Sequence, residues 1–144
     1  MYSDCYLRKN IVYIPTMEKT VDGIYVASEP IAVVPVDNTD ELQRAFRETF
    51  SLGNPIVPRV DFRKDKRPDV RQYAGVKTWA AFERGTTAWS IAEKEGVYDI
   101  CICRRHRDGG WIDDLDQKVT FPPGTNIDEV CARIVEIIQA KARE

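Results

Sequence analysis

The first third of the chain holds short runs of β-branched and aromatic residues that are separated by turn signals. Ile11–Ile14 and Ile24–Val26 lie on either side of Asp22-Gly23, a dipeptide typical of a tight hairpin because glycine tolerates positive φ. A third run, Ile31–Val34, has a proline at each end. Proline cannot donate a ladder hydrogen bond and favours an edge position or a bulge. The pattern predicts an N-terminal hairpin with a strand near the edge of a sheet.

Two segments place apolar residues at helical spacing. The first follows Asn38, a good N-cap residue, and ends at Gly53, which predicts a helix over 39–52. The second follows Asn126 and is the final helix of the chain. Its apolar face comprises Ile127, Val130, Cys131, Ile134, Val135 and Ile138. A shorter helix is predicted over Val76–Arg84, with Trp79 and Ala80 facing inward.

Between these helices, three further strands are predicted. Thr87–Glu93 alternates in polarity, Glu95-Gly96 turns the chain, and Val97–Arg105 forms the next strand. A third strand, interrupted at residues 113–116, comprises Trp111-Ile112 and Lys118–Phe121. Strands joined by such short turns pair antiparallel.

The order of elements predicts an α+β fold that occupies 1–144 as one domain. We expect an antiparallel sheet of five to six strands, built from an N-terminal hairpin and a C-terminal three-stranded meander. Two to three helices are expected to pack on one side of this sheet.

Composition and charge narrow the class of protein. The chain has 144 residues with a net charge of −2, which disfavours nucleic acid as the partner, because nucleic-acid binders usually carry a basic excess. No stretch approaches the ~18 consecutive apolar residues that a membrane span needs. No secretory signal is visible at the start, so a cytoplasmic protein is expected. Whether the chain forms oligomers stays open.

The four cysteines do not suggest a metal site or a cofactor. Cys131 falls on the apolar face of the last helix, so it is expected in the core. Cys101, Cys103 and His106 offer at most three ligands in one run, whereas a structural zinc site needs four, usually as two separated pairs. Phosphate-binding glycine loops and the common hydrolase signatures are absent from the sequence.

Two stretches leave alternative functions open. His106 lies among Arg104, Arg105 and Arg107, which suits a small phosphodiesterase-like enzyme, although the plainer interpretation is a solvated strand end. The basic loop 59–71 would suit a nucleic-acid-binding regulatory module, but three aspartates interrupt it.

Carboxylates gather after the turn that follows His106. The candidate binding residues are Asp108, Trp111, Asp113, Asp114 and Asp116. An aromatic anchor ringed by carboxylates suits a basic protein partner, while the alternative is an ordinary hairpin tip with Trp111 in the core. The spacing does not match an EF-hand, so calcium is not expected.

Two runs carry a family resemblance. Tyr73–Gly85 and Arg104–Asn126 resemble small immunity proteins of bacterial contact-dependent growth inhibition systems, and the resemblance extends over Val21–Gln139. It implies a protein without catalytic activity that binds and neutralises the C-terminal toxin domain delivered by a neighbouring cell. Such toxins are often nucleases with basic substrate grooves, which would suit the acidic hairpin. The resemblance assigns no individual residues.

Overall fold

The computed structural model describes all 144 residues and shows an α+β protein with an eight-stranded, mainly antiparallel sheet. The main path of the sheet runs β3-β2-β1-β5-β6-β7, β4 adds to β2 in parallel, and β8 adds to β6. The predicted fold class is confirmed, with more strands than the five to six expected. The strands are β1 (Tyr2–Arg8), β2 (Ile11–Thr20), β3 (Tyr25–Pro35), β4 (Ile56–Val57), β5 (Thr86–Lys94), β6 (Val97–Arg105), β7 (Trp111–Asp113) and β8 (Val119–Thr120).

Strand β1 lies at the centre of the sheet, and the sequence interpretation missed it. It pairs with β2 through the tight turn at Lys9-Asn10, where both residues have positive φ, and with β5 along its whole length. Cys5 and Leu7 are buried on one face, whereas Tyr6 projects from the other. β1 therefore joins the two predicted halves of the sheet into one.

The N-terminal hairpin forms as predicted. β2 and β3 flank the turn that contains Asp22-Gly23, and the side chain of Thr20 accepts the backbone N–H of Ile24 at 3.0 Å. β3 is the terminal strand of the sheet, as its prolines indicated, and its register with β2 shifts between Pro15 and Thr16. Both proline predictions, the edge and the bulge, are therefore confirmed.

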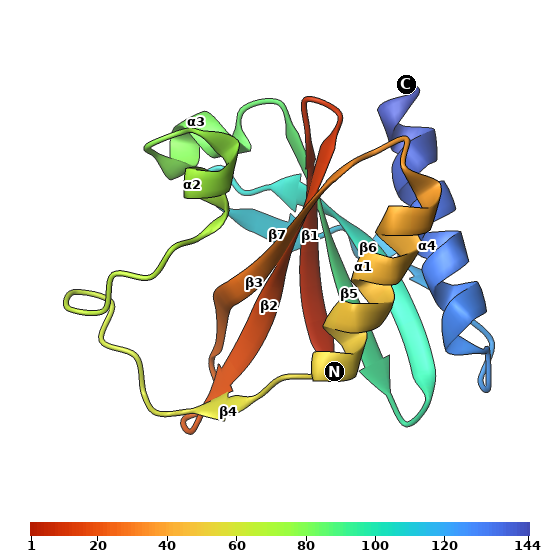
Figure 1. The fold of residues 1–144 in the computed structure, drawn as a ribbon, viewed down its shortest axis with the longest axis horizontal. Coiled ribbons are helices and arrows are strands. Elements are labelled where there is room, and N and C mark those ends of the chain that lie inside the picture. Colours follow the sequence, from red (N-terminus) through yellow and green to blue (C-terminus); the bar gives the residue numbers. More distant parts are fainter.

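The two long helices also match the prediction. α1 (Thr39–Leu52) is capped by Asn38, whose side chain accepts the backbone N–H of Glu41, and α4 (Ile127–Ala142) is capped by Asn126. They lie side by side on one face of the sheet (Figure 1). No helix combines the length and the apolar character that crossing a bilayer requires.

The main core lies between these helices and the sheet. Phe46, Ile134 and Ile138 meet Val12, Ile14 and Ile91 there, all essentially without exposure. Cys131 belongs to this core, as expected. Burial of these side chains provides the main favourable contribution to folding.

The expectation that all helices pack on one side is wrong. α2 (Val70–Ala74) and α3 (Trp79–Glu83) lie on the opposite side of the sheet from α1 and α4 (Figure 1). A second apolar cluster explains their position, because Val70 and Phe82 pack there against Tyr13 and Ile31 of the sheet.

The predicted inward face of the short helix is also wrong. Trp79 and Ala80 are exposed, whereas Phe82 and Glu83 are buried. Thr78 caps the helix by accepting the backbone N–H of Ala81, which starts α3 later than predicted. Packing of Phe82 against Tyr13 and Ile31 selects the face that is buried.

The meander holds an insertion at the edge of β6. β7 and β8 pair with the same edge, with Asp113 opposite Cys103 and Val119 opposite Ile100. Six positions separate Asp113 from Val119, whereas three separate their partners. The surplus of three residues forms a short 3₁₀ turn, η1 (Leu115–Gln117), which projects from the sheet.

We predict that Phe46→Ala lowers the free energy of unfolding by about 3–5 kcal/mol, because truncating a fully buried phenylalanine leaves a cavity. Leu52→Ala is the matched control, since Leu52 lies on the same helix and is 50% exposed. Urea denaturation measures both variants. Equal losses in the two variants would contradict the described core.

Candidate functional site

The hairpin between β6 and β7 is anchored by Trp111. This indole is half-buried and packs against Tyr6 and Phe82, with ring centroids 5.4 and 6.3 Å apart, respectively. Trp111 is therefore part of the small second cluster while one part of its ring remains accessible. The sequence left open whether Trp111 is an exposed binding anchor or a core residue. Because it is half-buried, it has features of both.

Glu83 fixes the tip of this hairpin, and the sequence interpretation did not identify it. The carboxylate is 6% exposed and accepts hydrogen bonds from the Arg105 guanidinium at 3.0 Å and from the Gly110 backbone N–H at 2.9 Å. The sequence around Glu83 does not indicate that this carboxylate is buried, because a glutamate in a short helix is usually exposed. Its two bonds join α3 to the hairpin and pre-organise the segment that follows.

Asp113 projects from the sheet face opposite α1 and α4. Its Oδ1 accepts hydrogen bonds from the Ser90 hydroxyl at 2.7 Å and from the Cys103 thiol at 3.5 Å. Burial, followed by the hydrogen bond to Asp113, raises the pKa of Cys103 to about 12, so this thiol stays protonated and can donate.

A second carboxylate, Asp4, shares this face and accepts a hydrogen bond from the Tyr2 hydroxyl at 2.6 Å. Burial raises the pKa of Asp4 from 3.8 to about 6; the Tyr2 hydrogen bond opposes this, and the charge of Asp113 adds to it. The charge of this carboxylate also raises the pKa of Cys103 and of Tyr6. Asp4 was not among the predicted site residues because nothing in the sequence placed it near Asp113.

The remaining predicted residues occupy different positions. Asp114 precedes η1 and accepts a hydrogen bond from the Gln117 amide at 2.6 Å, while Asp116 lies on η1 and is exposed. Asp108 lies at the hairpin tip, 3.7 Å from the His106 ring. The structure brings Asp113, Asp114 and Asp116 into one short stretch of the sheet edge and leaves Asp108 apart from them.

Four carboxylates in this region have no cationic partner. Asp4, Asp113, Asp114 and Asp116 form no ion pair with any Lys, Arg or His side chain in the structure, whereas Asp99 is paired with Lys118 at 3.7 Å. Of these four, Asp4 and Asp114 are partly buried, and partly buried carboxylates without a cation are costly to fold. Their arrangement favours binding of a positively charged group from outside the chain.

The alternative enzymatic site has little support in the geometry. His106 lies in the hairpin turn and its Nδ1 accepts the Asp108 backbone N–H at 3.1 Å. Of the neighbouring arginines, Arg105 is held by Glu83. The turn leaves His106 with one ring nitrogen already hydrogen-bonded, and none of the larger cavities is lined by His106.

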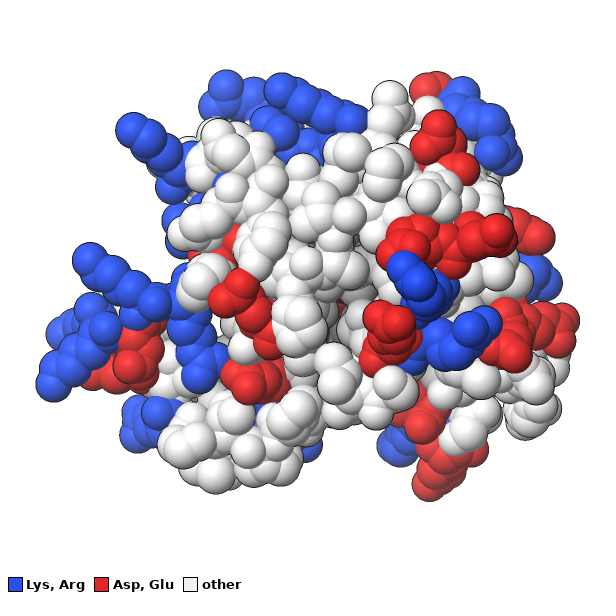
Figure 2. Space-filling model, in the orientation of Figure 1, with Lys and Arg blue, Asp and Glu red and all other residues white.

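The basic loop 59–71 projects on the side of the sheet opposite the long helices, and its Lys and Arg side chains are visible at the left of Figure 2. Three of its arginines are paired with acidic side chains: Arg59 with Asp22, Arg67 with Glu18 and Arg71 with Asp69. These pairs remove half of the basic charge that phosphate binding would use.

Comparisons with known proteins add a fold relationship. No protein-family model and no curated protein matches the sequence. Among solved structures, a protein of unknown function from Neisseria meningitidis, NMB0488, is similar with a TM-score of 0.69 and 13% identity, over 97% of this chain and 93% of that one. A chain of the CdiA-CT/CdiI toxin and immunity complex from Yersinia pseudotuberculosis is similar with a TM-score of 0.62 and 11% identity, over 95% of each chain.

We predict that Asp4→Asn stabilises the protein at pH 7. Because the folded state raises the pKa of Asp4, a charge on this group costs the folded protein up to about 3 kcal/mol, fully present above pH 6 and relieved as the pH falls towards 4. The amide oxygen of asparagine can still accept the Tyr2 hydroxyl. Urea denaturation at pH 7 and pH 4.5 should show the full gain at pH 7 and about a third of it at pH 4.5. A variant that is less stable at pH 7 would contradict the assignment.

Proposed function

We propose that this protein is an immunity protein that binds and neutralises a toxin domain of a contact-dependent growth inhibition system in the cytoplasm. The observation that carries the proposal is the set of four unpaired carboxylates along β1, β7 and η1. The fold similarity to a chain from a toxin and immunity complex supports the same role. The sequence runs at residues 73–85 and 104–126 support it independently.

The chemistry of the carboxylates indicates what kind of toxin it would be. A nuclease binds phosphates through a cationic groove, and carboxylates can occupy the positions of those phosphates. Asp113 and Asp4 present charge on the sheet face, and Asp114 and Asp116 present it at the edge. We infer a toxin domain with a basic surface, a nuclease being the enzyme class that fits best.

The surface is also held rigid before binding. Glu83 fixes the hairpin tip, Ser90 orients Asp113, and Gln117 orients Asp114. A pre-organised surface loses less conformational entropy on association, which is the property an inhibitor that must act at low concentration needs. The arrangement is that of a binding surface and requires no cofactor.

The test uses the C-terminal toxin domain of any contact-dependent growth inhibition exoprotein that is encoded next to this gene, produced without the rest of that exoprotein. We predict that Asp114→Asn with Asp116→Asn weakens binding of that domain at least tenfold at low salt, because two charge pairs across the interface are lost. Asp37→Asn with Glu48→Gln is the matched control, since it removes two exposed charges from around α1. Calorimetric titration measures the affinity, and survival of cells producing the toxin measures protection.

The proposal fails if the unmodified protein neither binds nor protects against that domain. It fails only in its choice of surface if the unmodified protein protects and the two double variants bind equally well. Loss of affinity should become smaller as salt increases, because ions screen exposed charges.

A further inference from the structure

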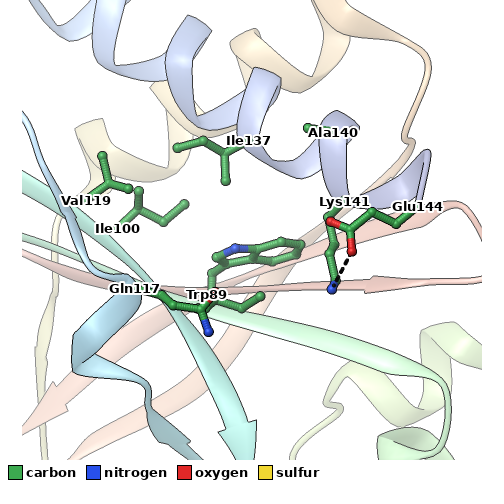
Figure 3. A pocket seen from close by; sticks show the side chains of 9 residues that line it. Trp89, Ile100, Gln117, Val119, Ile137, Ala140, Lys141 and Glu144 are labelled. Carbon is green, nitrogen blue, oxygen red and sulfur yellow. Dashed lines mark hydrogen bonds and ion pairs between the residues drawn. The ribbon is translucent and has the colours of Figure 1, made fainter.

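An apolar groove lies between the C-terminal half of α4 and the edge of the sheet formed by β5, β6 and β8 (Figure 3). Trp89 and Ile100 belong to the main core and form part of its lining. Figure 3 shows Ile137 and Ala140 of α4 facing Trp89 and Val119 across this space. The apolar lining consists of Trp89, Ile100, Ile102, Val119, Ile137 and Ala140.

The size of the groove indicates what it can hold. Its volume is about 250 Å³, below the roughly 300–1,000 Å³ of pockets for drug-sized ligands. Trp89 is 2% exposed and Val119 is 37% exposed, so the groove runs from the core to open solvent. These dimensions suit one large apolar side chain that enters from outside.

Apolar surface continues beyond the groove along the same sheet edge. Leu115 of η1 is 69% exposed and Ile112 of β7 is 37% exposed. Ile112 is opposite Arg104 in the antiparallel pair, so it projects from the same sheet face as Ile102 in the groove. Leu115 is exposed because it belongs to the three extra residues between β7 and β8.

The unpaired charge beside the groove is acidic. Asp114 and Asp116 flank Leu115, and Glu144 lines the groove at its open end. The nearest cation, Lys141, is paired with Glu144 at 3.1 Å (Figure 3), and Lys118 is paired with Asp99. An apolar group bearing neighbouring positive charges is therefore complementary to this surface, and an acidic one is repelled.

We propose that the groove is the docking site for one large apolar side chain of the protein partner, carried on a segment with flanking Lys or Arg residues that meet Asp114 and Asp116. This inference rests on the proposed function, since the partner is the toxin domain. A buried apolar anchor surrounded by charge pairs is the arrangement in which a few residues provide most of the binding energy.

The experiment blocks the groove without disturbing the core. Ala140 is exposed on the last turns of α4, so Ala140→Arg places a long cationic side chain at the groove entrance. Ala80→Arg is the matched control, since Ala80 is an exposed helical alanine on the opposite side of the sheet. Val119→Lys approaches the groove from β8 and separates groove effects from helix effects. Circular dichroism and thermal unfolding verify that all three variants fold.

We expect Ala140→Arg and Val119→Lys to weaken binding of the purified toxin domain by at least about 30-fold, with Ala80→Arg unchanged. If the unmodified protein binds and all variants bind equally, the groove inference is overturned while the proposed function stands. If the unmodified protein binds no toxin domain, the proposed function itself fails. If the groove variants alter only self-association in light scattering, the occupant is a second copy and the inference is overturned.

Discussion

β7 and β8 both pair with the same edge of β6, and the segment that connects them has more residues than the stretch of β6 that it runs beside. β7 ends with Asp113 opposite Cys103, and β8 begins with Val119 opposite Ile100. The three surplus residues between them must therefore leave the plane of the sheet. They form η1, which places Leu115 and Asp116 in solvent. Three features depend on this mismatch in length: the acidic edge formed by Asp113, Asp114 and Asp116, the exposure of Leu115, and the wall of the groove that contains Val119.

The rest of the structure holds that edge in place. α4 packs on one face and supplies the second wall of the groove, while α3 reaches the hairpin from the other face through Glu83. Trp111 ties β7 to the aromatic cluster around Phe82. A surface fixed from both faces of a sheet can present charge without collapsing onto it, which is what tight protein recognition requires.

The long helices were predictable because local signals agree with tertiary packing. Asn38 and Asn126 mark the starts of α1 and α4, and the apolar spacing marks their buried faces. β1 was missed because Asp4 and Arg8 interrupt the apolar pattern, although Cys5 and Leu7 are buried on one face. The inward face of α3 was mispredicted because only packing against Tyr13 and Ile31 selects Phe82 over Trp79.

The candidate site was predictable only in its local part. Asp113, Asp114 and Asp116 are close in sequence and stay close in the fold, but Asp4 joins Asp113 through strand pairing across more than a hundred residues. Glu83 is a further long-range contact that no spacing rule reveals. The groove likewise requires α4 and β8 to meet, which depends on the register of the whole sheet.

Hydrogen exchange of the protein, alone and mixed with the proposed toxin partner, is the decisive measurement. The account predicts slower amide exchange on binding in residues 111–120 and in the last turns of α4, where the acidic edge and the groove meet. Slower exchange confined to loop 59–71, or to the exposed face of α1, would contradict it.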